Sequence, residues 1–311
     1  MDFGKEPSGC IFDVKRYSIH DGPGIRTTFF FKGCPLSCWW CHNPEGISPL
    51  PAPSYHPNRC IGCGRCVREC PMGARSLVAE GVVLDSSKCV ECRKCEQVCP
   101  TRAIEFVGTE MTVEDVLRLS KRDIPFYDES GGGVTFSGGE PLLQPEFLVS
   151  CLKALHAEEI HTAVDTSGYC REEDLLLAAE TADIFLFDLK MIDQELHKHY
   201  TGVNNHRILA NLRSLDDRLH ERGRGKINVR IPLIPGVNDS DAEIMAMIDC
   251  VLELKSVTGV NILPYHSIGS GKYKNLSMEY RMEGTKPPSE EEVGRVLSMF
   301  EMRGIIAVKG G

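Results

Sequence analysis

Residues 27–41 read Thr27-Thr28-Phe29-Phe30-Phe31-Lys32-Gly33-Cys34-Pro35-Leu36-Ser37-Cys38-Trp39-Trp40-Cys41. The first five residues are β-branched or aromatic, which is typical of a buried strand. Three cysteines follow with gaps of three and two residues. Three thiolates leave one iron of a four-iron cubane without a protein ligand, as a catalytic metal site keeps one position open. The alternative is a closed site in which His42 supplies the fourth ligand.

The strand of residues 27–31 is the first of six that we predict in a repeating pattern. After residue 103, apolar β-branched runs alternate with amphipathic stretches, which indicates βα units around a parallel sheet. A closed eight-unit barrel needs about 250 residues, so we expect an α/β fold with a partial (β/α)6 TIM-like barrel. The predicted strands are 27–31, 134–136, 161–164, 184–189, 227–231 and 259–263, and the predicted helices are 113–121, 145–156, 171–181, 206–222, 240–254 and 289–302.

Eight further cysteines form an internal repeat. The run Cys60-Ile-Gly-Cys63-Gly-Arg-Cys66-Val-Arg-Glu-Cys70-Pro71 recurs with the same spacing from Cys89 to Pro100. Such gaps let three thiolates of one loop bind a cubane, while the fourth cysteine reaches the cluster of the other half. Two zinc sites are the alternative. The predicted ligand sets are Cys60, Cys63, Cys66 and Cys99 for one cluster and Cys89, Cys92, Cys95 and Cys70 for the other, as in the bacterial two-cluster ferredoxins that the segment resembles.

This repeat divides the predicted barrel in two. We expect residues 1–50 to begin the barrel and carry the active cluster loop. Residues 51–103 would form an inserted ferredoxin-like α+β domain, and residues 104–311 would complete the barrel. Cys10, Cys151, Cys170 and Cys250 stand outside any ligand spacing, and we interpret them as small apolar core residues.

Composition places the chain among ordinary globular proteins, with 311 residues of which 42% are hydrophobic. The formal net charge of -9 argues against nucleic acid as a partner. Residues 1–7 lack the apolar core of a signal peptide, and no run approaches the roughly 20 apolar residues of a membrane span. We therefore expect a cytoplasmic monomer without a membrane partner, whose 15 cysteines stay reduced.

Polar residues follow the predicted strands, at the edge where parallel α/β folds bind ligands. Gly138, Gly139 and Glu140 follow the second strand, and paired glycines with a carboxylate suit the amino end of a small zwitterion. Two residues at the strand ends also have a purely structural interpretation, Lys190 as a surface lysine and His266 as a histidine of the core. The other strand ends contribute Asp165, Thr166, Asp188, Leu189 and Arg230.

Together these motifs resemble a known family. The three-cysteine group is similar to the signature of radical S-adenosylmethionine (SAM) enzymes. Residues 21–26 (DGPGIR), 131–140 (GGGVTFSGGE), 165–168 (DTSG) and 263–266 (LPYH) resemble the glycyl-radical-enzyme activating enzymes. The resemblance implies an oxidoreductase that cleaves SAM reductively to a 5'-deoxyadenosyl radical. That radical would abstract a hydrogen from a backbone glycine of a partner glycyl radical enzyme, which is a lyase, decarboxylase or dehydratase.

The resemblance also implies roles for individual residues. Trp40, Cys41 and His42 would lie against the adenosine. The methionine amine would be met by Gly138, Gly139 and Glu140, and other polar groups of SAM by Asp188, Leu189 and Lys190. The remaining contacts would include His266 and Arg230. Asp165, Thr166 and Asp188 match positions around a monovalent cation. The turn of residues 21–26 would help to accept the partner's glycine loop.

The inserted repeat separates this chain from the pyruvate formate-lyase activators, which lack it. With this repeat, the chain is similar to activators of arylacetate decarboxylases, benzylsuccinate synthase, glycerol or propanediol dehydratases, choline lyase and isethionate lyase. Three four-iron clusters are implied, with flavodoxin or ferredoxin as electron donor. Two other functions stay open: a radical SAM enzyme acting on a small molecule, and an electron carrier, against which the open iron site argues.

Overall fold

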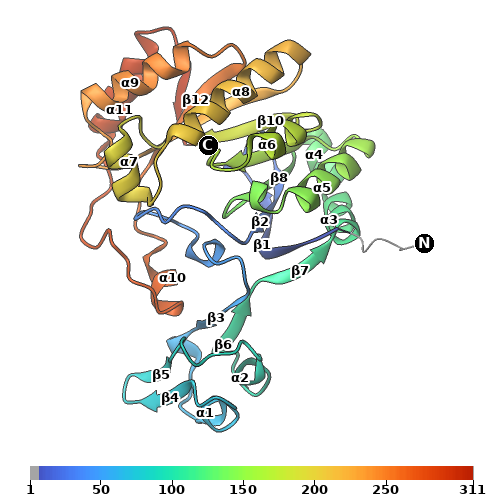
Figure 1. The fold of residues 1–311 in the computed structure, drawn as a ribbon, viewed down its shortest axis with the longest axis vertical. Helices are drawn as coiled ribbons and strands as arrows, with labels where there is room; N and C mark the ends of the chain where they lie inside the picture. Colours follow the sequence, from blue (N-terminus) through green and yellow to red (C-terminus); the bar gives the residue numbers. More distant parts are fainter. Residues whose placement is uncertain (1–6, 311) are drawn as a thin grey trace.

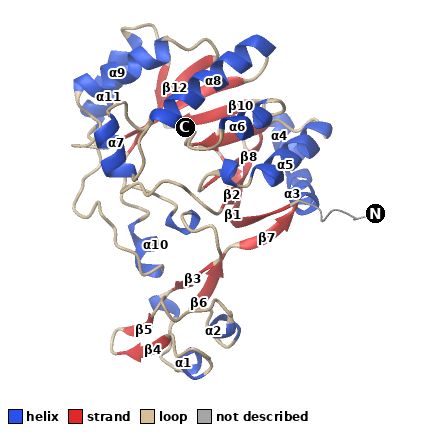
Figure 2. Ribbon diagram, in the orientation of Figure 1, coloured by secondary structure: helices blue, strands red, loops and turns tan. Residues whose placement is uncertain are grey.

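The protein consists of a large body and a smaller cysteine-rich segment that projects from it (Figure 1). A computed structural model describes residues 7–310. Residues 1–6, which make up most of the stretch considered above for a targeting signal, and residue 311 lie outside the described part. A sheet of nine strands forms the centre of the body (Figure 2).

The sheet is mostly parallel and open. Its order is β13-β12-β11-β10-β9-β8-β2-β1-β7, and the strands from β2 to β13 in that order run parallel, whereas β1 is antiparallel to β2 and β7. This confirms the predicted α/β class and is consistent with a partial barrel. The strands are β1 (Ser8–Ser18), β2 (Arg26–Phe31), β7 (Thr109–Thr112), β8 (Gly133–Gly138), β9 (Thr162–Thr166), β10 (Ile184–Asp188), β11 (Lys226–Leu233), β12 (Val257–Pro264) and β13 (Ala307–Lys309).

All six predicted strands are present, but β1, β7 and β13 were not predicted. Strands β7 and β13 have four and three residues, too few to show a period of two. Strand β1 is exposed over much of its second half, so its apolar residues do not continue as a run. Tertiary pairing rather than local pattern therefore determines these three strands.

The six predicted helices are also present, within a few residues of their expected ends. Capping boxes begin two of them, at Thr112 with Asp115 and at Ser289 with Glu292. No helix in residues 7–310 has the length and apolar character needed to cross a membrane. These helices are α3 (Val113–Ser120), α5 (Pro145–Ala157), α6 (Glu172–Ala179), α8 (His206–Arg222), α9 (Asp241–Leu252) and α11 (Glu290–Glu301), and those not predicted are α1 (Arg65–Arg68), α2 (Lys94–Gln97), α4 (Ile124–Ser130), α7 (Gln194–Thr201) and α10 (Ser270–Asn275).

The cysteine-rich segment is built from two similar halves. Each half runs strand, cysteine loop, one-turn helix, strand, and each element of the second half begins 29 residues after its counterpart. Strands of the first half pair with strands of the second half. The pairs are β3 (Ala52–Tyr55) with β6 (Ile104–Val107), and β4 (Arg75–Val78) with β5 (Gly81–Leu84). Strand β6 lies beyond the predicted boundary at residue 103, yet through β3 it belongs to this segment.

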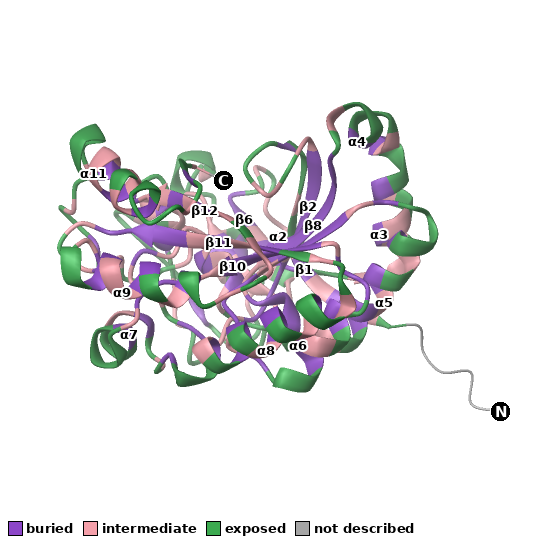
Figure 3. Ribbon diagram, turned by 90° about the horizontal axis from the view of Figure 1, so that it is seen from above, coloured by how far each residue is buried: buried purple, intermediate pink, exposed green. Residues whose placement is uncertain are grey.

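Apolar side chains fill the space between the sheet and its helices. Phe29, Phe31 and Phe136 of neighbouring strands β2 and β8 are fully buried. The centroid of the Phe136 ring lies 6.0 Å from that of Phe29 and 5.7 Å from that of Phe31. Figure 3 shows buried strands in the middle and helices whose outward faces are exposed. This core fixes the positions of the strand ends relative to one another.

We expect Leu152→Ala to lower the free energy of unfolding by about 2–5 kcal/mol, because Leu152 of α5 is fully buried and truncation leaves a cavity. The matched control is Leu177→Ala in α6, where 46% of the side chain is exposed and the change should stay within about 0.5 kcal/mol. Urea unfolding followed by circular dichroism measures both, and equal losses would contradict the assigned core.

Candidate active site

A cavity of about 540 Å³ opens at the carboxyl ends of the parallel strands. Its size is in the range of ligand sites, and its walls combine apolar, aromatic and charged side chains. The wall comes from the cysteine loop and from the ends of β8, β9, β10, β11 and β12. The sequence-predicted residues that line it are Cys34, Cys38, Trp40, Cys41, His42, Gly138, Gly139, Asp165, Thr166, Asp188, Lys190, Arg230 and His266.

The cysteine loop is fastened at several points by backbone hydrogen bonds. At its base, the Gly33 N–H donates to the Gly46 carbonyl at 2.7 Å and the Cys34 N–H to the Ile47 carbonyl at 3.0 Å. Further along, the Ser37 N–H donates to the Thr201 carbonyl of α7 at 2.8 Å. The Tyr273 hydroxyl of α10 donates to the Cys41 carbonyl at 2.9 Å. The two unpredicted helices α7 and α10 thus position the thiols.

The three thiols of this loop fit a bound metal cluster. Burial raises the pKa of Cys34, Cys38 and Cys41, that of Cys38 to about 12, so each stays protonated near pH 7 unless a cation compensates it. The iron ions of an iron–sulfur cluster, which thiolate ligands favour, are such cations. Within residues 7–310 no three His, Cys, Asp or Glu side chains converge as ligands of a single metal ion. The thiolates of a cubane bind separate irons, so this concerns single ions only.

Two predicted contact residues do not lie on the cavity wall. The Glu140 carboxylate is fully buried and accepts hydrogen bonds from the Thr166 hydroxyl at 2.7 Å and from the Ser167 N–H at 2.8 Å. Burial raises the pKa of Glu140, and these hydrogen bonds oppose the shift. Leu189 is buried in the core, with its N–H donating to the Arg230 carbonyl at 2.9 Å. Glu140 therefore ties the end of β8 to the end of β9.

The paired glycines after β8 are required by the fold itself. Gly138 has a φ of +112°, which side chains rarely adopt. A Cβ on Gly139 would lie 2.2 Å from the Gly33 oxygen and 2.7 Å from the Gly46 oxygen, both at the base of the cysteine loop. These are backbone atoms that cannot yield cheaply, so this position needs glycine whatever the cavity binds.

The DGPGIR turn packs against the GGG motif in the same manner. A Cβ on Gly24 would lie 2.5 Å from the Gly132 nitrogen. Beneath the turn, the fully buried Arg26 donates to the Thr135 hydroxyl at 2.6 Å and to the Pro23 carbonyl at 3.0 Å. Asp21 of this turn lines the cavity. The first two motifs therefore pack closely together, and the turn contributes Asp21 to the cavity wall.

Buried charges meet on the opposite wall. The Lys190 ammonium donates to the Asp188 carboxylate. Arg230 Nη1 lies 3.5 Å from Asp165 Oδ2, which also accepts from the Ser137 hydroxyl at 2.6 Å. Burial raises the pKa of Asp165 to about 6 although Arg230 opposes the shift. Within residues 7–310, Arg230 Nε and Nη1 are buried without a hydrogen-bond partner, Nη1 having only the 3.5 Å ion pair with Asp165, so both can donate to a ligand in the cavity.

His42 and His266 form a stacked pair at the cavity. Their ring centroids lie 4.0 Å apart with an interplanar angle of 14°, and His42 Nε2 lies 3.1 Å from the His266 carbonyl oxygen. Burial lowers the pKa of His42 to about 4, so its ring is neutral at pH 7. The buried His266 Nδ1 has no hydrogen-bond partner among residues 7–310, so this wall too presents a free polar atom.

The sequence did not point to several other residues of the wall. Lys15 and His20 come from or follow β1, which was not predicted, and Asn43 follows the cysteine group. The β-hairpin pairing of β1 with β2 brings the first two to the cavity. The turn-forming glycines between residues 18 and 26 were the available signal for this hairpin.

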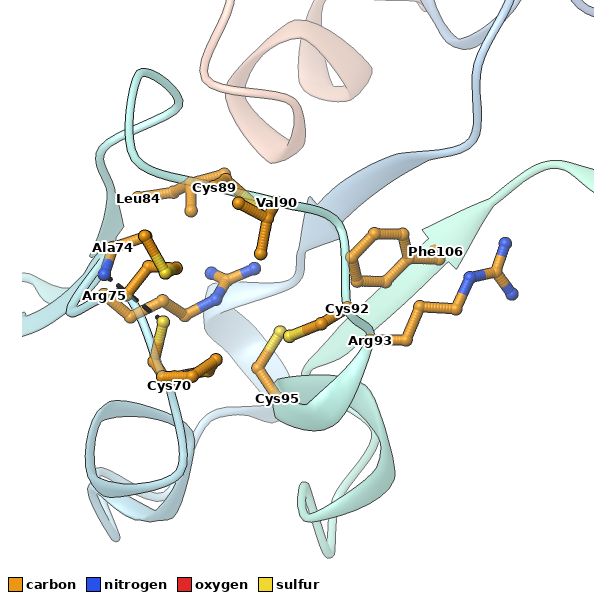
Figure 4. Close-up of a pocket in the computed structure, with 12 residues that line it drawn as sticks. Cys70, Ala74, Arg75, Leu84, Cys89, Val90, Cys92, Arg93, Cys95 and Phe106 are labelled. Atoms are coloured by element: carbon orange, nitrogen blue, oxygen red, sulfur yellow. Dashed lines mark hydrogen bonds between the residues drawn. The ribbon is translucent and has the colours of Figure 1, made fainter.

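The eight cysteines of the repeat fall into two groups of four. Cys60, Cys63, Cys66 and Cys99 line one small cavity, and Cys70, Cys89, Cys92 and Cys95 line another (Figure 4). Each group takes three cysteines from one half and the fourth from the other half. The Ala74 N–H donates to Cys70 Sγ and the Ala103 N–H to Cys99 Sγ, both at 3.2 Å. The geometry of the two halves is thus closely matched.

Comparison with known proteins identifies the family. The sequence profile of the radical SAM superfamily matches residues 28–248, which carry the cysteine loop and four of the strand ends that line the cavity. The chain belongs to the radical SAM superfamily. Membership implies a four-iron cluster and SAM as cofactors of this radical SAM enzyme, and the residues of its cavity fit both.

Its relatives within the superfamily are activating enzymes. The chain is 41% identical to the choline trimethylamine-lyase activating enzyme of Oleidesulfovibrio alaskensis over 94% of each chain. It is 42% identical to the trans-4-hydroxy-L-proline dehydratase activating enzyme of Clostridioides difficile, over 97% of this chain and 99% of that one. This radical SAM enzyme therefore belongs to the activating enzymes, as the sequence predicted.

A solved structure shows the same fold at low identity. Streptococcus suis SuiB bound to the precursor peptide SuiA is 14% identical, with a TM-score of 0.52 over 89% of this chain and 46% of that one. This similarity concerns the fold alone.

We expect Gly139→Ala to weaken SAM binding at least about tenfold, because the new methyl group displaces the base of the cysteine loop. The matched control is Gly271→Ala in α10, where a Cβ meets nothing within 4 Å and the affinity should not change. Anaerobic equilibrium dialysis with SAM measures both variants. Equal affinities in the two variants would show that Gly139 does not position the loop.

Proposed function

We propose that this radical SAM enzyme activates a glycyl radical enzyme by abstracting a hydrogen atom from a backbone glycine of that partner. One observation carries the proposal: the three-cysteine loop and the DGPGIR turn face the same cavity, since Cys34, Cys38, Cys41 and Asp21 all line it. A SAM-cleaving centre and a backbone turn on the wall of one cavity suit a substrate that is itself a peptide loop.

Cys34, Cys38 and Cys41 would hold the active four-iron cluster and leave one iron for SAM. When bound, cluster and SAM supply an electron transfer that cleaves a carbon–sulfur bond of SAM, giving methionine and a 5'-deoxyadenosyl radical. The chain contributes position and exclusion of water. Hydrogen transfer from the glycine Cα to the 5'-carbon would leave 5'-deoxyadenosine and a glycine-centred radical.

The remaining wall residues would hold SAM in one orientation. The free donors of Arg230 and the ion pair of Asp188 with Lys190 would meet its polar groups, Gly138 and Gly139 its amine through backbone atoms, and Trp40, His42 and His266 its adenosine. Asp165, Thr166 and Asp188 offer oxygen ligands to a monovalent cation beside the methionine carboxylate. Glu140 would act one layer further out, by holding Thr166 and Ser167.

The turn of residues 21–26 would receive the glycine loop. Asp21 Oδ2 accepts from the Thr28 hydroxyl at 2.8 Å and also from the Ser18 hydroxyl, so its side chain holds the turn from within. Its backbone carbonyl accepts from the Thr135 hydroxyl at 2.6 Å. A turn fixed in this way needs little ordering when a partner binds.

The cysteine-rich segment, at residues 51–103 with β6, would form a ferredoxin-like insertion with two further four-iron clusters. Their ligands would be Cys60, Cys63, Cys66 and Cys99, and Cys89, Cys92, Cys95 and Cys70. The grouping of these thiols around two separate cavities supports that assignment. Flavodoxin or ferredoxin would deliver electrons to a cytoplasmic, monomeric enzyme.

Replacing Cys34, Cys38 and Cys41 together by alanine should abolish SAM cleavage while about eight of about twelve irons remain, because only the open cluster loses its ligands. Iron analysis and chromatographic detection of 5'-deoxyadenosine after anaerobic reconstitution measure the two effects. The control Cys250→Ala, outside every cysteine group, should retain all irons and full cleavage. Nucleoside release by the triple variant would refute the active cluster.

Mixing the reduced enzyme and SAM with a glycyl radical enzyme encoded beside it should produce a glycine-centred doublet in the electron paramagnetic resonance (EPR) spectrum. Replacing the radical-site glycine of the partner by alanine should remove the doublet. Steady SAM cleavage without a doublet from any neighbouring lyase would favour the small-molecule alternative. Absence of SAM cleavage in the fully reconstituted enzyme would favour the alternative function as an electron carrier.

A further inference from the structure

The two cavities of the cysteine repeat differ in one buried charge. Arg75 is 4% exposed and lines the cavity of Cys70, Cys89, Cys92 and Cys95. Its counterpart 29 residues later is Ile104, which is 1% exposed and lines the cavity of the other four cysteines. The repeat therefore places a buried cation on the wall of one cavity and an aliphatic side chain at the equivalent position of the other, although the charge of Arg75 also acts on the Cys66 thiol of the second group and the exposed Arg65 lines that cavity.

The guanidinium of Arg75 lacks an anionic partner in the described chain. Among residues 7–310 no carboxylate forms an ion pair with it, and its buried Nε has no hydrogen-bond partner. Burying an unpaired cation is costly, so the position indicates an anionic group. Figure 4 shows the guanidinium among the side chains of Cys70, Cys89 and Val90. A cubane with four thiolates carries net negative charge and would provide that anion.

Arg93 offers an internal contrast within the same cavity wall. Its Nη2 donates to the Gly108 carbonyl at 3.1 Å, and its guanidinium carbon lies 5.1 Å from the centre of the Phe106 ring. In Figure 4 this guanidinium points away from the cysteines, beyond Phe106. Arg93 is therefore satisfied by other groups, whereas Arg75 is not.

We infer that Arg75 makes the two clusters of the repeat unequal, by giving the cluster of Cys70, Cys89, Cys92 and Cys95 the higher reduction potential. This inference rests on the two inserted clusters of the proposed function. One-electron reduction adds one negative charge to a cluster, and a fixed neighbouring cation stabilises the reduced form more than the oxidised form. An electron that enters the repeat then rests beside Arg75 rather than beside Ile104.

The other determinants of potential agree at some equivalent positions of the two halves and differ at others. The N–H···S hydrogen bonds to Cys70 and Cys99 have equal lengths. Cys63 and Cys92, which occupy equivalent positions, are both exposed. Cys66 is buried whereas its equivalent Cys95 is half-buried, and Cys60 Sγ accepts from the Gly62 N–H at 3.5 Å. Arg75 is the one buried cation among the residues that line the two cavities, and the inference assigns it the larger effect on potential.

The test is an EPR-monitored redox titration of the full reconstituted chain carrying alanine at 34, 38 and 41, so that the clusters of the repeat alone are titrated. Without further change, two one-electron steps of different potential are expected. Arg75→Met should lower the higher step by at least about tenfold in the reduction equilibrium constant, or about 59 mV, and shift the lower step less. Arg75→Gln should act likewise, while Arg75→Lys and the matched control Arg93→Met should keep both steps near their original potentials.

Unmoved potentials in both neutral variants, or an equal shift in Arg93→Met, would overturn the inference. If the neutral variants lose about four irons and Arg75→Lys keeps them, the cluster depends on the cation, and the inference stands only if the higher of the two redox steps is the one that disappears. Loss of those irons in all three Arg75 variants would assign the side chain a packing role instead. Fewer than about eight irons in the repeat before Arg75 is changed would refute the cluster assignment of the proposed function, whatever Arg75 does.

Discussion

The active site depends on a backbone contact between two loops, in which Gly139 lies against the base of the cysteine loop. The Glu140 N–H donates to the Gly33 carbonyl at 2.7 Å, and the Gly33 N–H donates to the Gly46 carbonyl at the same distance. At Gly139 no side chain fits between these backbone segments. The contact joins the end of β8 to the loop that follows β2, so the three thiols stand beside the strand ends that form the rest of the cavity.

From that contact, polar links continue across the sheet. Glu140 reaches Thr166 and Ser167 at the end of β9, and Ser137 reaches Asp165. Arg230 of β11 is paired with Asp165 in turn. The first links connect the neighbouring strands β8 and β9, and the Arg230–Asp165 pair spans β10 between β9 and β11 at the same edge. A site of this kind is pre-organised, because the fold has already met the cost of bringing its charged groups together.

The cysteine-rich segment follows a different principle, since symmetry rather than a single contact builds it. Two halves with the same order of elements exchange strands and each lends one cysteine to the other. Such a module can hold two equal sites. At equivalent positions one half has Arg75 and the other Ile104, so the walls of the two cavities differ by a buried cation, which requires an anion nearby.

The amino-acid sequence by itself determined the order of strands and helices in the barrel, the two kinds of cysteine group and the family. The order of elements and the two kinds of cysteine group depend on local period and spacing, which a single chain displays directly, whereas the family followed from the resemblance of its motifs. The tertiary structure decided what depends on distant partners: that β1 completes the sheet, that α7 and α10 hold the cysteine loop, and that Glu140 faces the core rather than the cavity. Neither the direction of a side chain nor the pairing of a short strand is encoded by nearby residues, because both are settled by the groups that fold against them.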